Sequence, residues 1–227
     1  MTVNPALVIF DMAGTTLEDR GQVPAAFAAT LAANGLPITP DEIMRVRGAS
    51  KRQAIRDLLQ GPSSKACLDE ASSRSQADRI YNEFRRELAG AYMNGGVKCV
   101  GGADLAIKRL RTSGRKVALT TGFDRDIATL LLTSIGWTRD TIDAVVCGDD
   151  VDNGRPAPDM ILLAMQLTGV SDPGMVANVG DTTLDLESAA RAGVRWNIGV
   201  LSGAHAREAL ERAPHTHIIQ SVAALPF

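Results

Sequence analysis

A short apolar run, Val8–Phe10, ends in Asp11 and then in the small and hydroxyl-bearing residues Ala13–Thr16. The run is too short for a helix and has no polar face, which is typical of a strand buried inside a parallel sheet. Gly14 allows a sharp turn that exposes backbone N–H groups. Because open α/β sheets bind ligands beyond the carboxyl ends of their strands, the sequence predicts that Asp11 lies in a binding site. The alternative is that Asp11 caps the next helix.

Strand-like and helix-like segments alternate through the second half of the chain. Apolar, β-branched runs predict strands at 116–120, 142–147, 176–179 and 196–200. Helical spacing of apolar residues predicts helices around 127–135, 159–168 and 184–192. Such alternation predicts an α/β fold with a mostly parallel sheet that helices cover on both faces.

The region between the first strand and this alternating part has a different pattern. Helix signals define segments at 24–35, from about 40, and at 51–59. The stretch that follows, 63–93, is polar, compatible with a helix and poor in β-branched residues. We therefore predict an all-helical domain over 19–94, inserted into a core made of residues 1–18 and 95–227.

The composition excludes several functional classes. The 227 residues are 45% hydrophobic and 22% charged, which is ordinary for a globular enzyme. A formal net charge of −2 argues against a general nucleic-acid partner. No apolar run approaches bilayer length, so no membrane partner is expected. Met1–Pro5 lacks the features of a signal peptide, which predicts a cytoplasmic protein. A homodimer is possible.

Four polar clusters fall at or near the predicted carboxyl ends of the strands. They are Asp11, Thr120–Gly122, Arg155 and Gly180–Asp185. Since the carboxyl ends of parallel strands meet at one edge of a sheet, these groups should converge on one site. The site would hold three carboxylates, which repel one another unless a cation neutralises them. An all-oxygen ligand set suits Mg²⁺, which bridges to substrate phosphate.

The other groups of this predicted site suit a phosphoryl substrate. Arg155 can screen phosphate charge, and Thr120 and the N–H groups around Gly122 can donate hydrogen bonds to phosphoryl oxygens. Asp11 is then left as a nucleophile toward phosphorus. The further candidates for contact with the substrate or its phosphate are Ala13, Gly14, Thr15, Thr121 and Arg47.

The set resembles the haloacid dehalogenase superfamily, whose four motifs are matched in order by Asp11, Thr120, Arg155 and the pair Asp181 and Asp185. The resemblance covers essentially the whole chain. It implies a Rossmann-like core with an inserted helical cap, and a covalent aspartyl-phosphate on Asp11. It also implies that Mg²⁺ is held by Asp11, the backbone carbonyl of Ala13 and Asp181, with Asp185 assisting.

Ala13 points to a particular branch of this superfamily. Most of its phosphatases carry an aspartate two residues after the nucleophile, which protonates the leaving group, and a methyl group cannot do this. The stretch Asp11–Thr16 resembles the phosphonatase branch, phosphonoacetaldehyde hydrolase and its relatives, where alanine holds this place. In that branch a cap lysine follows a glycine by three residues, and Gly48–Lys51 has this spacing.

The resemblance makes Lys51 a candidate to condense with an aldehyde, so that the carbon–phosphorus bond can break. A position in the first turn of a helix, beside Arg47 and Arg52, would disfavour its ammonium form. The alternative is a solvated lysine at a helix start. Positions that depart from the branch include Ala54 and Phe123, which stand in place of histidine and tyrosine.

Three functions are therefore compatible with the sequence. The first is Mg²⁺-dependent hydrolysis of a small phosphonate of the phosphonoacetaldehyde type through Asp11. The second is hydrolysis of a small phosphate monoester such as phosphoglycolate, because the segment Gly199–Gly203 resembles phosphoglycolate phosphatases. The third is a phosphate-binding module without catalysis, which the intact set of carboxylates disfavours.

Overall fold

The computed structural model describes residues 4–60 and 70–227. The chain divides into two compact units. Met1–Asp19 and Val97–Phe227 together form one unit, here called the core unit, and Arg20–Gly96 forms the other, here called the helical unit. Each unit is described by itself.

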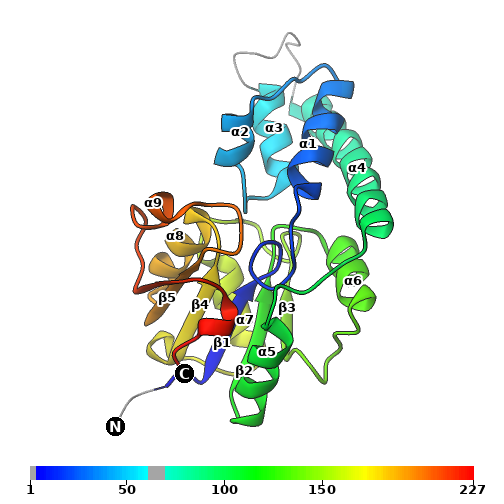
Figure 1. Ribbon diagram of the computed structural model, residues 1–227. Helices are drawn as coiled ribbons and strands as arrows, with labels where there is room; N and C mark the ends of the chain where they lie inside the picture. Colours follow the sequence, from blue (N-terminus) through cyan, green and yellow to red (C-terminus); the bar gives the residue numbers. More distant parts are fainter. Residues whose placement is uncertain (1–3, 61–69) are drawn as a thin grey trace. The chain divides into compact units, whose positions relative to one another are not determined.

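The core unit contains one parallel sheet. Within the described residues its strands are β1 (Leu7–Asp11), β2 (Lys116–Thr120), β3 (Ala144–Val146), β4 (Val176–Gly180), β5 (Trp196–Val200) and β6 (His217–Ile219). They pair in the order β3-β2-β1-β4-β5-β6, and every pair is parallel. Figure 1 shows β1 near the middle of this sheet. The predicted α/β class, with a parallel sheet and an inserted helical region, is confirmed.

Helices connect the strands and cover the sheet. They are α5 (Ala103–Thr112), α6 (Arg125–Ser134), α7 (Asp159–Thr168), α8 (Thr183–Ala192) and α9 (Arg207–Leu210). Short 3₁₀ turns occur at Pro173–Met175 and Val222–Ala224. The chain moves from β1 to β2 and β3 in one direction and then crosses to β4 in the other direction. Because crossovers between parallel strands are right-handed, this reversal places α5 and α7 on opposite faces of the sheet. Figure 1 accordingly shows α5 in front of the sheet and α7 behind it.

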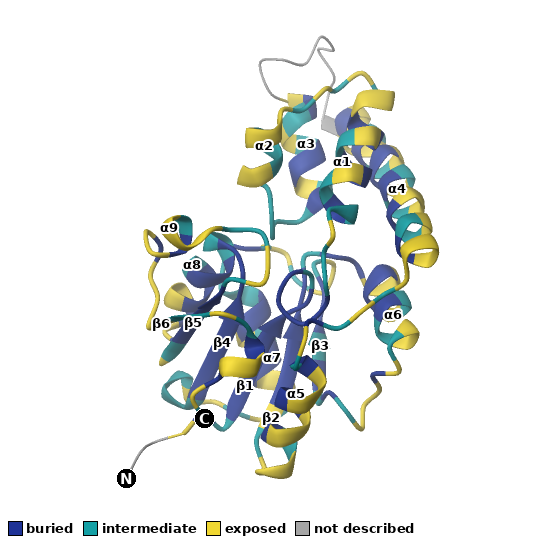
Figure 2. Ribbon diagram, in the orientation of Figure 1, coloured by how far each residue is buried: buried dark blue, intermediate teal, exposed yellow. Residues whose placement is uncertain are grey.

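The apolar run recognised in the sequence forms the centre of the core. All residues of β1 are buried, and Figure 2 shows the same for most of the sheet. Leu7 and Ile9 belong to a hydrophobic cluster with Met160 of α7 and Ala189 of α8. Each large apolar side chain buried in this way contributes about 1.5–3 kcal/mol to the free energy of folding. This packing fixes the position of the carboxyl end of β1, where Asp11 lies.

The helical unit consists of α1 (Gln22–Ala33), α2 (Pro40–Arg45), α3 (Lys51–Gln60) and α4 (Glu70–Gly95) among the described residues. Helix α4 packs against both α1 and α3. Its buried residues Ile80, Phe84 and Leu88 recur every four positions and so form one face of the helix. Phe84 meets Phe27 of α1 edge to face, with ring centroids 5.5 Å apart.

Two elements differ from the sequence-based expectation. Strand β3 covers Ala144–Val146 and not the whole of 142–147, because the Ile142 N–H donates to the Thr138 carbonyl at 2.9 Å and the Cys147 N–H to the Asp150 carboxylate at 2.7 Å. Helix α5 is not among the predicted elements, although its buried residues Ala103, Ala106 and Leu110 follow helical spacing. Part of the predicted 63–93 helix lies outside the described residues. In residues 4–60 and 70–227, no helix is both long and apolar enough to cross a membrane.

Asp143 joins the edge of the sheet to its neighbours. Its carboxylate accepts hydrogen bonds from the Val117 N–H at 2.9 Å and from Lys116 at 3.1 Å, and it also pairs with Arg111. Burial alone would raise the pKa of Asp143, but these three partners outweigh burial and lower it. The charged form of Asp143 therefore stabilises the folded state.

We expect Asp143→Asn to destabilise the protein by about 1–2 kcal/mol at pH 7, because it removes charge-assisted hydrogen bonds. A lowered folded-state pKa gives stability that is present above the unfolded value of about 4 and is lost as the pH falls further. The difference in melting temperature between wild type and variant should therefore shrink from pH 7 toward pH 3. Circular dichroism melts measure it. Exposed Asp140→Asn is the control, and equal melting temperatures for all three proteins would contradict this role.

Candidate active site

Asp11 and Thr120 lie side by side at the carboxyl ends of two neighbouring strands. Asp11 is the last residue of β1, and its register partner on β2 is Thr120. On its other side β1 pairs with β4, which Asp181 follows directly. The chain leaves β1 toward β2 on one side and returns to β4 on the other, so the site lies where the direction of winding reverses. Parallel sheets bind ligands at such points.

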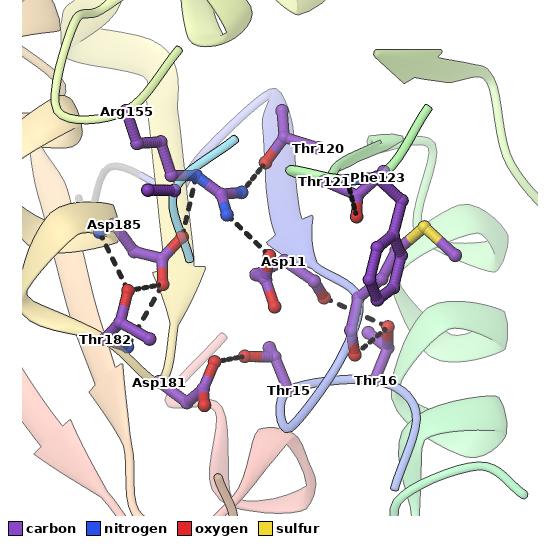
Figure 3. A network of polar contacts seen from close by, with 12 residues as sticks. Asp11, Thr15, Thr16, Thr120, Thr121, Phe123, Arg155, Asp181, Thr182 and Asp185 are labelled. Carbon is purple, nitrogen blue, oxygen red and sulfur yellow. Dashed lines mark hydrogen bonds and ion pairs between the residues drawn. The ribbon is translucent and has the colours of Figure 1, made fainter. Parts of the chain in front are cut away.

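Arg155 connects the ends of β1 and β2 with the start of α8. Figure 3 shows its guanidinium pointing between Asp11, Thr120 and Asp185. One nitrogen donates to Asp11 Oδ1 at 2.7 Å and another to the Thr120 hydroxyl at 2.7 Å. The Nε atom lies 2.9 Å from Asp185 Oδ1. The Arg155 side chain is only 3% exposed, so its planar fork holds these partners in a fixed geometry.

The electrostatics of this cluster depend on burial. Burial raises the pKa of the Asp11 carboxyl well above its usual range; Arg155 opposes the shift, while Asp185 and Asp181 add to it. Burial disfavours the charge on Arg155 as well, but Asp185 and Asp11 outweigh this effect and raise its pKa, so Arg155 stays charged. Three carboxylates thus share one resident cation, and a second cation would relieve the repulsion that remains.

Asp185 is held from both sides by the protein. It is the third residue of α8, and its Oδ2 accepts hydrogen bonds from the Thr182 N–H at 3.0 Å and from the Thr182 hydroxyl at 2.6 Å. The Thr182 hydroxyl in turn accepts from the Asp185 N–H, which completes a capping box. Since Oδ1 faces Arg155, both oxygens have protein partners. Its assisting role toward a metal stays a prediction.

Asp181 faces the loop that follows Asp11. The Thr15 hydroxyl donates to Asp181 Oδ1 at 3.1 Å, as Figure 3 shows. Gly14 has a φ of +97°, and a Cβ atom built on it would lie 2.4 Å from Asp181 Oδ2. Glycine is therefore needed here both for the backbone conformation and for the close approach. The sequence predicted that this turn exposes N–H groups, but the Gly14 N–H itself donates to the Leu17 carbonyl at 2.7 Å.

The loop after β2 carries the other predicted phosphate contacts. Thr121 is buried, and its hydroxyl accepts a hydrogen bond from the Phe123 N–H at 3.2 Å. Gly148, in the loop after β3, packs against the carbonyl of Gly122, where a Cβ atom would come within 2.9 Å. The Gly148 N–H also donates to the Phe123 carbonyl at 2.7 Å. The two loops therefore fix the position of Thr120–Gly122.

The oxygen atoms at this site suit a hard cation. Across residues 4–60 and 70–227, no three His, Cys, Asp or Glu side chains come together closely enough to hold a metal by themselves. The predicted ligands are two carboxylates, Asp11 and Asp181, with the Ala13 carbonyl. Mg²⁺ keeps several of its waters and needs few protein ligands, so this set is chemically sufficient. The crowded, buried charge at Asp11 also favours a cation at this place.

In the helical unit, Lys51 is the first residue of α3 and is 5% exposed, so it is not a solvated lysine. Its Nζ donates to the carbonyls of Val46 at 2.7 Å and Ala49 at 3.1 Å, and lies 5.7 Å from the centre of the Phe27 ring. The two carbonyls and the ring therefore hold Lys51 Nζ in place, and its role as an amine nucleophile stays a prediction. Arg47 is half-buried in the turn after α2.

The structure also brings to Asp181 a group of residues that were not predicted. The Ala204 N–H donates to Asp181 Oδ2 at 2.6 Å, and the His205 N–H donates to the Asp181 carbonyl at 3.2 Å. The Ser202 hydroxyl donates to the Gly14 carbonyl at 2.8 Å. The position of these residues directly after a predicted strand was a signal that they would reach the same edge of the sheet.

Comparisons with known proteins identify the family. The family model for haloacid dehalogenase-like hydrolases matches residues 8–198. Phosphonoacetaldehyde hydrolase of Bacteroides fragilis is 29% identical over 213 residues, which cover 92% of this chain and 80% of that protein. The phosphonoacetaldehyde hydrolase of Paraburkholderia xenovorans is 30% identical over 198 residues, covering 85% of this chain and 73% of that protein.

Solved structures share the fold. A phosphonoacetaldehyde hydrolase-like protein from Oleispira antarctica aligns with a TM-score of 0.81 at 24% identity, covering 100% of this chain and 93% of the other. A hydrolase from Pseudomonas syringae aligns with a TM-score of 0.83 at 24% identity, covering 96% and 94%. At these identities the two structures support the architecture alone.

We expect Arg155→Met to destabilise the protein by about 3–5 kcal/mol, because it leaves buried carboxylates without their cation. The melting temperature should fall by on the order of 10 °C. Differential scanning calorimetry measures this change. Arg191→Met is the matched control, since the Arg191 side chain is 55% exposed and its ion pair with Glu187 is long, at 3.9 Å. If both variants melted alike, the cluster would not depend on Arg155.

Proposed function

Because the chain belongs to the haloacid dehalogenase-like hydrolases, we propose that it cleaves the carbon–phosphorus bond of a small phosphonate of the phosphonoacetaldehyde type. Asp11 is the proposed nucleophile, and Mg²⁺ the proposed cofactor. The observation that carries this proposal is Ala13, which occupies the place of a leaving-group acid. The curated relatives named above, which are phosphonoacetaldehyde hydrolases, support it.

The consequence of Ala13 is chemical. Cleavage of a phosphate ester expels an alkoxide, and a general acid that protonates it contributes about 10²–10⁴-fold to the rate. Ala13 has no proton to give. A reaction whose leaving group is stabilised in another way has no need of this acid, and a carbon leaving group conjugated to an iminium meets that condition.

The core residues have defined parts in the proposed reaction. The Asp11 carboxylate attacks phosphorus and forms an aspartyl-phosphate, while the electron pair of the carbon–phosphorus bond stays on carbon. Arg155 holds Asp11 at 2.7 Å and keeps a positive charge beside the transferred group. The Thr120 oxygen accepts from Arg155, so its own hydrogen can donate to a phosphoryl oxygen. Water then hydrolyses the aspartyl-phosphate to phosphate and free Asp11.

Mg²⁺ would be held by Asp11, the Ala13 carbonyl and Asp181, with Asp185 assisting. When bound, it supplies positive charge that reduces repulsion between the phosphoryl oxygens and the Asp11 carboxylate. The chain's own residues prepare this site by directing hydrogen bonds to both Asp181 oxygens, from Thr15 and from Ala204.

Lys51 is the proposed source of the iminium. Its amine condenses with the aldehyde carbon and releases water, and the protonated imine accepts the electron pair from the broken bond as an enamine. Protonation and hydrolysis of the enamine return acetaldehyde and free Lys51. The amine must first lose a proton, and the two N–H groups that remain match the two carbonyl acceptors, Val46 and Ala49. An ordered, buried amine of this kind supports the proposal.

We expect Mg²⁺-dependent release of phosphate from phosphonoacetaldehyde by the wild-type protein. Asp11→Asn should lower the rate by about 10⁴-fold or more, because it removes the nucleophile. A colorimetric phosphate assay with and without Mg²⁺ measures both, and Asp140→Asn, an exposed change of the same kind, is the control. Release from phosphoglycolate alone would show a phosphatase, and release from neither substrate would count against the proposed activity.

We expect borohydride to inactivate the wild-type protein only when phosphonoacetaldehyde or acetaldehyde is present, since reduction would fix the imine on Lys51. Lys51→Arg should lose phosphonate hydrolysis and gain no adduct. Mass spectrometry of the reduced protein locates the modified residue. Lys108→Arg is the control, because Lys108 is exposed on α5. Full turnover by Lys51→Arg would exclude the imine.

A further inference from the structure

The segment Ser202–His205 follows β5 and lies beside the loops that carry the predicted metal ligands. Its members bond to three other parts of the core unit: the Gly14 turn, Asp181, and the start of α8. Asp181 and Thr183 belong to one loop after β4, whereas the Gly14 turn comes from a distant stretch of sequence. The segment is therefore in a position to set their arrangement.

The segment helps to set the orientation of the Asp181 carboxylate. The Ala204 N–H donates to Oδ2 at 2.6 Å, and the Thr15 hydroxyl donates to Oδ1 at 3.1 Å. These directed donors, which reach both oxygens, favour one rotation of the carboxylate. The His205 N–H also donates to the Asp181 carbonyl at 3.2 Å, so the segment holds both the backbone and the side chain of this residue.

Two glycines permit this close approach. A Cβ atom built on Gly203 would lie 2.0 Å from Asp181 Oδ2, a distance that no side chain can occupy. A Cβ atom on Gly14 would lie 3.0 Å from the Cα atom of Gly203. The Asp11 loop and the segment therefore enclose the Asp181 carboxylate from two sides, with backbone in direct contact with it.

Two side chains fasten the segment at its ends. The Ser202 hydroxyl donates to the Gly14 carbonyl at 2.8 Å, which ties the segment to the Asp11 loop. At the other end, His205 Nδ1 accepts the N–H of Thr183, the first residue of α8, at 3.1 Å. This N–H is one of those at a helix start that have no partner within the helix, so His205 caps the helix.

We propose that Ser202 and His205 are positioning residues for the divalent cation, acting through Asp181 and the Asp11 loop. The inference rests on the proposed function, since it takes Asp181 as a metal ligand. Neither side chain needs to touch the metal. Their hydrogen bonds hold the parts of the chain that carry the ligands, so their loss weakens metal binding because the ligands become less ordered.

The test uses the full chain and the metal alone as probe. We expect Ser202→Ala and His205→Ala each to raise the Mg²⁺ concentration that gives half-maximal phosphate release, by roughly tenfold. The rise in melting temperature caused by a fixed Mg²⁺ concentration should shrink in both variants. Without Mg²⁺, their melting temperatures should fall by only a few degrees, as expected for the loss of one hydrogen bond. Ser202→Thr keeps a hydroxyl donor and His205→Asn keeps an acceptor. Both should therefore show the wild-type Mg²⁺ concentration for half-maximal phosphate release.

Matched controls separate positioning from general stability. The Ser134 hydroxyl also donates to a backbone carbonyl, that of Leu130 at 2.8 Å, but on an exposed face of α6, and His217 is exposed on β6. Ser134→Ala and His217→Ala should leave the Mg²⁺ response unchanged. If Ser202→Ala and His205→Ala respond to Mg²⁺ as the wild type does, the inference is wrong even when the enzyme works. A wild type without any Mg²⁺ response would overturn the proposed function as well.

Discussion

The buried ion cluster around Arg155 is the constraint on which the rest of this structure depends. A carboxylate at the end of a central strand is costly, because burial removes its hydration. Arg155 offsets that cost for Asp11 and Asp185 at once, with contacts of 2.7 and 2.9 Å. These contacts therefore fix the positions of three parts relative to one another: the loop that carries Arg155, the start of α8 and the end of β1.

A second set of contacts refines the site without adding charge. Glycines at positions 14 and 203 let two backbone segments close on Asp181, and hydrogen bonds from N–H and hydroxyl groups direct its oxygens. Arg155 supplies the charge balance, whereas these neutral donors supply orientation. A site for a small cation needs both, because Mg²⁺ demands near-ideal geometry from its ligands.

The two units contribute different chemistry to the proposed reaction. In that proposal the core unit supplies Asp11 as nucleophile and the phosphate-binding groups, and Ala13 stands in the place of a leaving-group acid. The helical unit has a buried amine, Lys51, that two backbone carbonyls hold in place. In the proposal, Lys51 of the helical unit stabilises the leaving group as an iminium, which takes the place of the acid that Ala13 cannot supply. The proposal therefore rests on Ala13 and Lys51 taken together.

The sequence by itself determined the order of most strands and helices, though not α5, and the residues at the strand ends, because apolar periodicity and turn residues are local signals. It also placed Asp11, Thr120, Arg155 and Asp181 at one edge, since parallel strands share that edge. Only the tertiary structure decided hydrogen-bond partners, such as the carbonyls at Lys51 and the occupied oxygens of Asp185. The bond from Ser202 to Gly14 spans 188 residues of sequence, and no local pattern encodes a contact of that range.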